Sequence, residues 1–313
     1  IEEGVKIIAV YDDIADYILV KQGGKINAVG TPDKPIVMTS EKEEPGAWGG
    51  IHICGRAHTN AEGGKGSSEI GGAVYGGNDD ADNSGTLQYI RLEYTGFAFD
   101  EEHEANGISF YGVGNGTIVD HCQAYKGSDD GFEFFGGSVN VSNLVAVSCS
   151  DDSFDWTEGW NGKGTNLVAY QEDKSTLGYD CDCLMECDNN GSNNAATPVA
   201  HPVLKNLILV GNGGSKQGIR LRAGTEVEID NAKVCGKGQP LTVETALTEN
   251  ALKNGTSKLT NITLTSELSS KEGIYTHADF IAVTSNKVDA NLSYSSFEDI
   301  RKECSWMNGS WVK

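Results

Sequence analysis

The chain has 313 residues, of which 24 are Lys or Arg and 45 are Asp or Glu, so its formal net charge is −21. Nucleic-acid binding is excluded as the default function, because phosphate backbones require a basic face. The 38% hydrophobic content is too high for a disordered chain. No uncharged apolar run approaches the roughly 20 residues of a membrane-spanning helix, so we expect a folded protein without a transmembrane segment.

Short strands separated by turn residues dominate the chain from its start. The first residue, Ile1, lies directly in a strand-like stretch, from which we expect that a leader or lipid-anchor segment has been removed. Alternating apolar residues predict strands, and segments rich in Gly, Asn and charge predict projecting loops. The strands are expected at 17–20, 26–29, 36–38, 51–53 and 87–94, and the loops at 41–48, 58–82 and 188–202.

An internal repeat begins in the middle of the chain. Residues 127–134 (GSDDGFEF) return 22 residues later at 149–156 (CSDDSFDW), with acidic, apolar and turn positions repeating together. A second motif, Asn followed by a short apolar strand, recurs several times. Asn tolerates the left-handed conformation of a turn, and its amide can bond to the next copy. The copies begin at Asn143, Asn166, Asn206, Asn231 and Asn261.

This repeat predicts an all-β, right-handed parallel β-helix with coils of about 22 residues, because stacked coils share a core that no single coil can bury. A propeller and a sandwich are the alternatives, disfavoured by repeat length and regularity. We assign 1–240 to coils with inserted loops. Residues 241–313 are assigned, within the same domain, to irregular final coils and a C-terminal cap over the open end of the solenoid. A helix is expected at 242–252.

Several motifs stand out along the first three quarters of the chain. They are 17–26 (YILVKQGGKI), 30–40 (GTPDKPIVMTS), 48–55 (WGGIHICG) and 75–85 (YGGNDDADNSG), followed by 127–137, 184–191 and 218–224. On these motifs the chain resembles a family of secreted or surface-attached right-handed parallel β-helix proteins of Bacteroidota, a family without a well-established activity. The resemblance covers roughly 1–235 and implies the fold and an extracellular or cell-surface location.

Registering the coils by their shared pattern predicts a ladder of like charges. Segments 107–111, 131–135, 153–157, 184–188 and 218–222 stack as one sheet, with alternate side chains pointing outward. Glu133, Asp155 and Glu186 then lie at about 4.8 Å intervals, where repulsion costs about 1 kcal/mol per neighbour in water. The ladder therefore demands a cation, a raised pKa or compensation by Arg220 and Arg222.

Three interpretations of this face remain open. In the first, Glu133, Asp155 and Glu186 are catalytic carboxylates of a polysaccharide hydrolase or lyase. In the second, the same face binds a glycan or another surface component without catalysis. In the third, the acids are solvated turns or structural calcium sites, the aromatics are core, and the protein is a scaffold. The candidate ligand-binding residues are Tyr111, Phe135 and Trp160, which would stack on sugar rings, and Asp188, Arg220 and Arg222.

Calcium is the predicted cofactor, at two places. Residues 80–85 (DADNSG) match the first half of an oxygen-ligand loop, in which Asp80, Asp82 and Ser84 would bind, although an unoccupied turn is the alternative. Stacked turn carboxylates offer a second place: Asp129 beneath Asp151, and Asp130 beneath Asp152.

Two further features lack a decisive pattern. Cys181, Cys183 and Cys187 are crowded, but structural zinc normally uses four ligands in paired spacings, so disulfides or buried thiols are favoured. The charged run 100–104 is typical of a solvated loop, with lining of the groove as the alternative. Together these observations predict an extracytoplasmic protein that binds a polysaccharide or cell-surface component along an acidic face.

Overall fold

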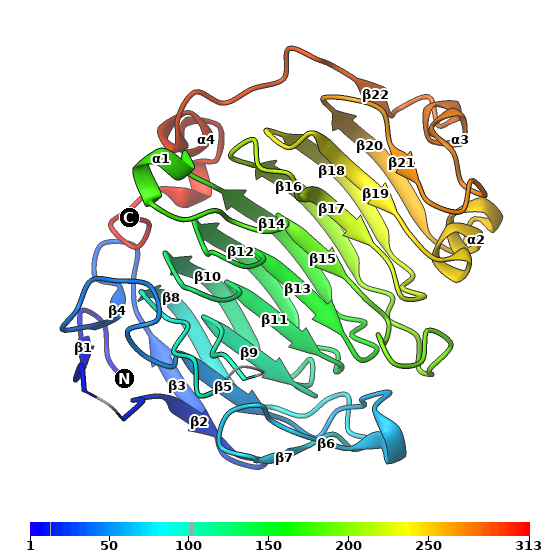
Figure 1. The fold of residues 1–313 in the computed structure, drawn as a ribbon. Helices are drawn as coiled ribbons and strands as arrows, with labels where there is room; N and C mark the ends of the chain where they lie inside the picture. Colours follow the sequence, from blue (N-terminus) through cyan, green and yellow to red (C-terminus); the bar gives the residue numbers. More distant parts are fainter. Residues whose placement is uncertain (13, 101–102) are drawn as a thin grey trace.

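The computed structural model describes residues 1–12, 14–100 and 103–313. Its described strands form two long parallel sheets that wind into a right-handed β-helix, as the repeat predicts (Figure 1). One apolar core runs between the sheets along the whole solenoid. Within the described part of the chain, no helix has the length and apolar character needed to cross a membrane.

The first sheet contains eleven described strands, with β3 pairing beside the main order. In spatial order the main strands are β1 (Lys6–Ala9), β4 (Ile36–Ser40), β8 (Gly85–Glu93), β10 (Ile118–Tyr125), β12 (Asn140–Val147), β14 (Lys163–Tyr170), β16 (Val203–Val210), β18 (Glu228–Cys235), β20 (Lys258–Leu264) and β22 (Lys287–Val288), and β3 is Ile26–Val29.

The second sheet contains nine described strands, most of them shorter. They are β2 (Ile18–Val20), β5 (Ile51–Cys54), β9 (Ile108–Tyr111), β11 (Phe132–Phe135), β13 (Phe154–Thr157), β15 (Met185–Cys187), β17 (Gln217–Leu221), β19 (Gln239–Val243) and β21 (Ser269–Ser270).

A bend divides each long strand of the first sheet at a residue with positive φ, which is Tyr89 in β8, His121 in β10 and the recurrent Asn in the later strands. Asn143, Asn166, Asn206 and Asn231 have φ between 55° and 64°, in the left-handed region that Asn tolerates. Asn166 donates to the side-chain oxygen of Asn143 at 2.8 Å, and Asn206 donates to that of Asn166 at 3.0 Å. The predicted turn role of this Asn and its bonding between copies are therefore confirmed.

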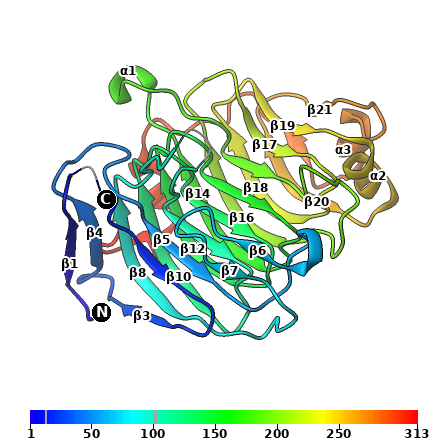
Figure 2. The same ribbon diagram turned by 60° about the horizontal axis from the view of Figure 1, so that its bottom comes forward.

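Inserted loops and the C-terminal region cover parts of the solenoid. The loop at 58–82 contains the turn η1 (Glu62–Gly64) and a hairpin of β6 (Gly66–Ser67) and β7 (Val74–Tyr75), which lies at the bottom of Figure 1 and comes to the front in Figure 2. The short helix α1 (Lys174–Leu177) belongs to another excursion. The expected helix at 242–252 is α2 (Ala246–Asn254), because the preceding residues continue strand β19.

Residues 241–313, which we assign to final coils and a cap, divide into two parts. The helices α2 and α3 (His277–Ala282) lie at the end of the solenoid, where Leu252 and Phe280 join the main core. The tail, with α4 (Phe297–Glu303) and η2 (Ser305–Met307), instead runs back along the first sheet toward the N-terminal coils (Figure 1). Trp311 is fully buried there, because the outward side chains of this sheet are apolar.

Candidate functional site

A column of polar side chains crosses the outward face of the second sheet. Strand pairing places Glu133 beside Asp155, Asp155 beside Glu186, and Glu186 beside Arg220. The inward neighbours stack in the core, where the rings of Phe132 and Phe154 are 5.6 Å apart. The predicted stacking of the three acids on one face is therefore confirmed, and their catalytic role stays a prediction.

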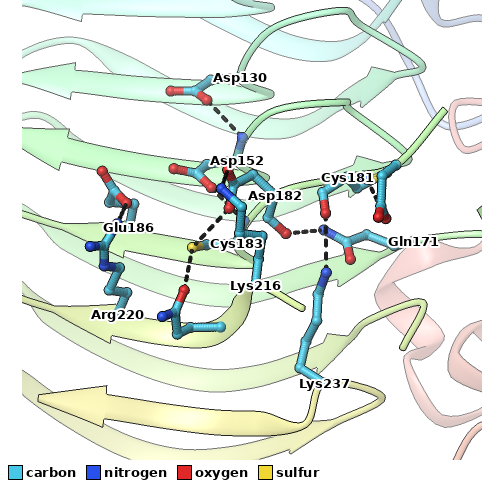
Figure 3. A network of polar contacts seen from close by, with 12 residues as sticks. Asp130, Asp152, Gln171, Cys181, Asp182, Cys183, Glu186, Lys216, Arg220 and Lys237 are labelled. Atoms are coloured by element: carbon cyan, nitrogen blue, oxygen red, sulfur yellow. Dashed lines mark hydrogen bonds and ion pairs between the residues drawn. The ribbon is translucent and has the colours of Figure 1, made fainter. Parts of the chain in front are cut away.

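Turn aspartates stack at the start of these same strands. Asp130 lies just before β11 and Asp152 just before β13, and both are buried. Oδ1 of Asp130 accepts a hydrogen bond from the backbone N–H of Asp152 at 2.8 Å. Oδ1 of Asp152 accepts one from the N–H of Cys183 at 2.6 Å (Figure 3). The backbone of each coil thus fixes the carboxylate of the coil before it.

Ladder and turn acids together line a cleft of about 500 Å³, which we call the acidic cleft. Two further carboxylates reach it from loops, Glu69 from the insertion at 58–82 and Glu104 from the segment before β9. Ten carboxylates therefore face one guanidinium across this small volume. The lining consists of Glu69, Glu104, Asp129, Asp130, Glu133, Asp151, Asp152, Asp155, Asp182, Glu186 and Arg220.

Burial and mutual repulsion raise the pKa of carboxyl groups throughout the acidic cleft. Burial and the neighbouring Asp151 raise the pKa of Asp129 to about 7. Burial and Asp182 raise the pKa of Asp151 to about 6. The pKa of Glu133 lies well above its ordinary value because the group is buried and faces Glu69 and Asp155. Without a cation, part of this cluster is therefore protonated near neutral pH.

Four overlapping groups of side chains offer oxygen or sulfur atoms within 4.8 Å of one another, as a metal ion requires. Three groups are entirely carboxylate, the donor type that suits Ca²⁺. In addition, Oδ1 of Asp155 is buried without a hydrogen-bond partner among the described residues. The carboxylate groups are Asp129 with Asp130 and Asp151, Asp130 with Glu133 and Asp155, and Asp152 with Asp155 and Glu186.

Two arginines neutralise one end of the ladder. Arg220 bonds to Glu186 at 3.0 Å and to Glu244 at 3.3 Å. Arg222 bonds to Asp188 at 2.7 Å and also contacts Glu186. Arg222 and Asp188, both predicted to bind ligand, thus bind each other. Of the predicted ligand-binding residues, only Arg220 lines the acidic cleft.

The aromatic residues proposed to stack on sugars are not accessible, so that prediction is wrong. Tyr111 is 0% and Phe135 8% exposed, because Ala73 and Tyr75 of the inserted loop cover them. Trp160 is 1% exposed and stacks on Phe134 at 4.1 Å inside the core. The loop that covers Tyr111 and Phe135 is distant from them in sequence, so the strand pattern does not predict that they are covered.

The motif at 80–85 is occupied by internal hydrogen bonds. Asp80 accepts from the backbone of His58 at 3.1 Å and contacts its ring at 2.7 Å. Oδ2 of Asp82 accepts a hydrogen bond from the backbone N–H of Arg56 at 3.1 Å, and the hydroxyl of Ser84 lies 3.5 Å from the same oxygen. These residues belong to none of the potential metal groups in the described part of the chain. These hydrogen bonds are those of a turn, and the calcium loop at 80–85 stays a prediction.

All eight cysteines are buried and unpaired. Of the two favoured alternatives, disulfides and buried thiols, the structure therefore shows buried thiols. Burial raises the pKa of Cys181 to about 12, which keeps its thiol protonated. Cys183 lies close to Asp152 and Asp182 rather than to a set of sulfur ligands. A thiolate metal cluster built on 181–187 is therefore not supported.

Sequence reasoning missed two lining carboxylates. Glu69 lies in a loop whose return to the second sheet depends on a hydrogen bond of 3.0 Å from the hydroxyl of Tyr111. Asp182 is the third turn aspartate, but no second aspartate follows it, so the Asp-Asp pattern does not mark it. Glu104 falls in the charged run at 100–104, which was interpreted mainly as a solvated loop. Glu101 and Glu102 of that run lie outside the described residues.

Comparison with known proteins gives one positive result. A family model described as a pectate-lyase-like beta helix domain matches residues 1–312. No curated protein matches the chain, and no solved structure matches it. Because the family model spans nearly the whole solenoid, including the sheet that carries the acidic cleft, the chain belongs to the pectate-lyase-like beta-helix family.

Proposed function

We propose that the acidic cleft binds calcium ions and, through them, a polysaccharide or another cell-surface component. The observation that carries this proposal is the charge imbalance: ten carboxylates and one arginine line about 500 Å³. Stacked carboxylates in a partly buried cleft repel one another more strongly than in water. A divalent cation relieves that repulsion and lowers the raised pKa values of the lining acids.

Calcium fits the donor set better than the transition metals do. It takes six to eight oxygen ligands in flexible geometry, while soft metals prefer sulfur and imidazole. The carboxylate triads around Asp130 and Asp155 supply only part of such a shell. The remaining positions are open to water, sugar hydroxyls or a uronate carboxylate. A calcium ion held in this way connects the protein to a saccharide.

Catalysis is a second candidate, favoured by one specific observation. Asp129 has a pKa of about 7, so it is a carboxylic acid that can donate a proton near neutral pH. Asp151 and the ladder residues Glu133, Asp155 and Glu186 provide carboxylates nearby. Arg222 is a poor candidate for a base, because Asp188 and Glu186 hold its pKa above the ordinary arginine value. Binding remains the first proposal and hydrolysis or lysis the second.

A secreted or cell-surface location is part of the same proposal. Calcium sites of extracellular modules have dissociation constants of about 0.1 to 1 mM, so even a weak calcium site in the acidic cleft is compatible with this location. The family resemblance of 1–235 points the same way. The unpaired cysteines contribute nothing to this argument, since no disulfide is present among them.

Calorimetric titration with Ca²⁺, together with thermal unfolding in Ca²⁺ or chelator, tests the cation step. At a calcium concentration 100 times the dissociation constant, binding adds about 2.7 kcal/mol to the free energy of unfolding. Asp155→Asn should abolish most of the binding heat and of this gain. Glu267→Gln, at an exposed acid outside the acidic cleft, is the matched control. An unfolding temperature that ignores both calcium and chelator refutes the proposal.

Incubation with neutral and uronate-containing polysaccharides separates binding from catalysis. Calcium-dependent retention without new reducing ends or unsaturated products supports binding. Product formation that Glu133→Gln or Asp129→Asn abolishes supports catalysis. If neither occurs with any polysaccharide while calcium still raises the unfolding temperature, the structural scaffold is the correct interpretation.

A further inference from the structure

A second hollow opens at the opposite end of strand β13 from the turn aspartates. It has a volume of about 700 Å³, and its lining residues include Asn60, Glu62, Thr157, Glu158, Asn190 and Asn193. Thr157 ends β13 and follows Phe135 in the same column of the second sheet. The inserted loop covers Phe135 with Ala73 and Tyr75, and its residues 60–62 line the hollow together with Thr157.

Glu158 is held in a conformation that its backbone resists. Its φ is 54°, in the left-handed region that a non-glycine residue enters only at a cost. The hydroxyls of Thr59 and Tyr75 donate to it at 2.6 and 2.8 Å, and both bonds end on the same oxygen, Oε2. Among the described residues, Oε1 has no hydrogen-bond partner, and the side chain lines the hollow. One carboxylate oxygen is thus fixed, and the other is presented to a ligand.

The amides around this carboxylate are fixed by one another. Asn190 donates to the side-chain oxygen of Asn60 at 2.9 Å, and Asn60 donates to that of Asn189 at 2.8 Å. The oxygen of Asn190 accepts the backbone N–H groups of Ser192 and Asn193 at 3.0 and 2.9 Å. The second amide proton of Asn190 is not used in this network. The lining of the hollow therefore includes a positioned donor, Asn190, and the free acceptor oxygen of Glu158.

We propose that this hollow is a saccharide-binding site for neutral, hydroxyl-rich sugar units, with Glu158 accepting hydroxyl protons and Asn190 donating to hydroxyl oxygens. Glu158 belongs to no potential metal group in the described part of the chain, which distinguishes this hollow from the acidic cleft. A site with one free carboxylate oxygen and ordered amides matches hydroxyl groups, each of which is both donor and acceptor.

The inference rests on the proposed function in one respect: both sites would hold parts of one glycan. Asp155 and Thr157 point to the same side of β13 and are about 7 Å apart along the strand. The inserted loop joins the two places, since Glu69 lines the acidic cleft and Tyr75 positions Glu158. The ligand predicted by this arrangement carries a calcium-binding unit and a neutral unit next to it.

The test uses a panel of neutral tetrasaccharides of glucose, mannose, galactose or xylose, in chelator, with binding measured by ligand-observed NMR and calorimetry. We expect at least one to bind the unmodified protein. Glu158→Gln should weaken that binding about tenfold, because a hydrogen bond to a charged group contributes about that factor. Tyr75→Phe, which frees the carboxylate to move, should weaken it less. Glu267→Gln, at an exposed acid outside both the hollow and the acidic cleft, is the matched control.

The outcomes separate this inference from the proposed function. Loss of neutral-sugar binding in Glu158→Gln, with an unchanged calcium titration, supports the second site. Absence of binding by every tetrasaccharide, or equal binding by Glu158→Gln and Glu267→Gln, overturns it even if calcium-dependent retention persists. Failure of calcium binding with intact neutral-sugar binding refutes the acidic-cleft proposal alone. Unfolding temperatures of all variants identify any loss of fold, and Tyr75→Phe then serves as the deciding variant.

Discussion

The two sheets of this solenoid have the same construction but opposite outer faces. On the first sheet, outward residues such as Val145, Val168 and Ile208 are buried by the C-terminal tail. On the second sheet, Glu133, Asp155 and Glu186 occupy outward positions around an open cleft. The coil pattern alone thus does not determine whether an outward face is apolar or charged. The covering segments follow this difference, because the C-terminal tail covers the apolar face and the charged face is left accessible.

The largest expected effect comes from removing the centre of the cover. Trp311 is fully buried and packs edge-on against His121 at 5.2 Å. Trp311→Ala should lower the free energy of unfolding by about 3–5 kcal/mol, the usual cost of deleting a buried aromatic side chain. Hydrogen exchange should increase first in the tail, where the contacts are lost.

Trp306→Ala is the comparison variant, because that ring is only half-buried and packs at the margin of the same cluster. A smaller loss is expected there. If Trp311→Ala leaves both stability and tail exchange unchanged, the tail is not a structural cover, and the contrast between the two faces fails.

A medium effect is expected at the bend of the first sheet. Asn166→Ala removes two bonds of the Asn column and places alanine at φ 60°. The combined cost should be about 2–3 kcal/mol, from the lost hydrogen bonds and the left-handed backbone. Asn166→Gly restores the backbone preference alone and should recover part of the loss in chemical denaturation. If the two variants are equally stable, the left-handed backbone conformation does not contribute to the loss of stability in Asn166→Ala.

The smallest expected effect lies on the open face, where solvent screens part of the repulsion. The pKa values of Asp129 and Asp151 are raised to about 7 and 6, so the folded state holds protons that the unfolded state releases near pH 4. In chelator, their contribution to stability is therefore present at low pH and is lost as pH rises through 6 to 7.

Thermal unfolding between pH 5 and 8 measures this dependence. Asp129→Asn combined with Asp151→Asn should flatten the fall of unfolding temperature with rising pH, and saturating calcium should do the same in the unmodified protein. A double variant that keeps the full pH dependence would show that other groups control it.

Much of the fold follows from local patterns in the sequence. The 22-residue repeat predicts the coils, and the recurrent Asn marks a bend because its conformation and its amide are local properties. The ladder of Glu133, Asp155 and Glu186 follows from registering that repeat. What covers each face does not follow, since the tail, the loop over Tyr111 and the approach of Glu69 are long-range contacts. The wrong assignments of Tyr111 and Phe135 to a ligand-binding surface have this cause.

The common register of the coils has a consequence for how such a protein can grow. Because every coil from β10 to β18 bends at the same position and pairs without a shift, duplication of one coil adds a rung of about 4.8 Å and leaves the cross-section unchanged. The length of the acidic cleft therefore increases by one rung with each added coil. Relatives that differ by a single duplication would accommodate longer or shorter ligands with the same chemistry at each rung.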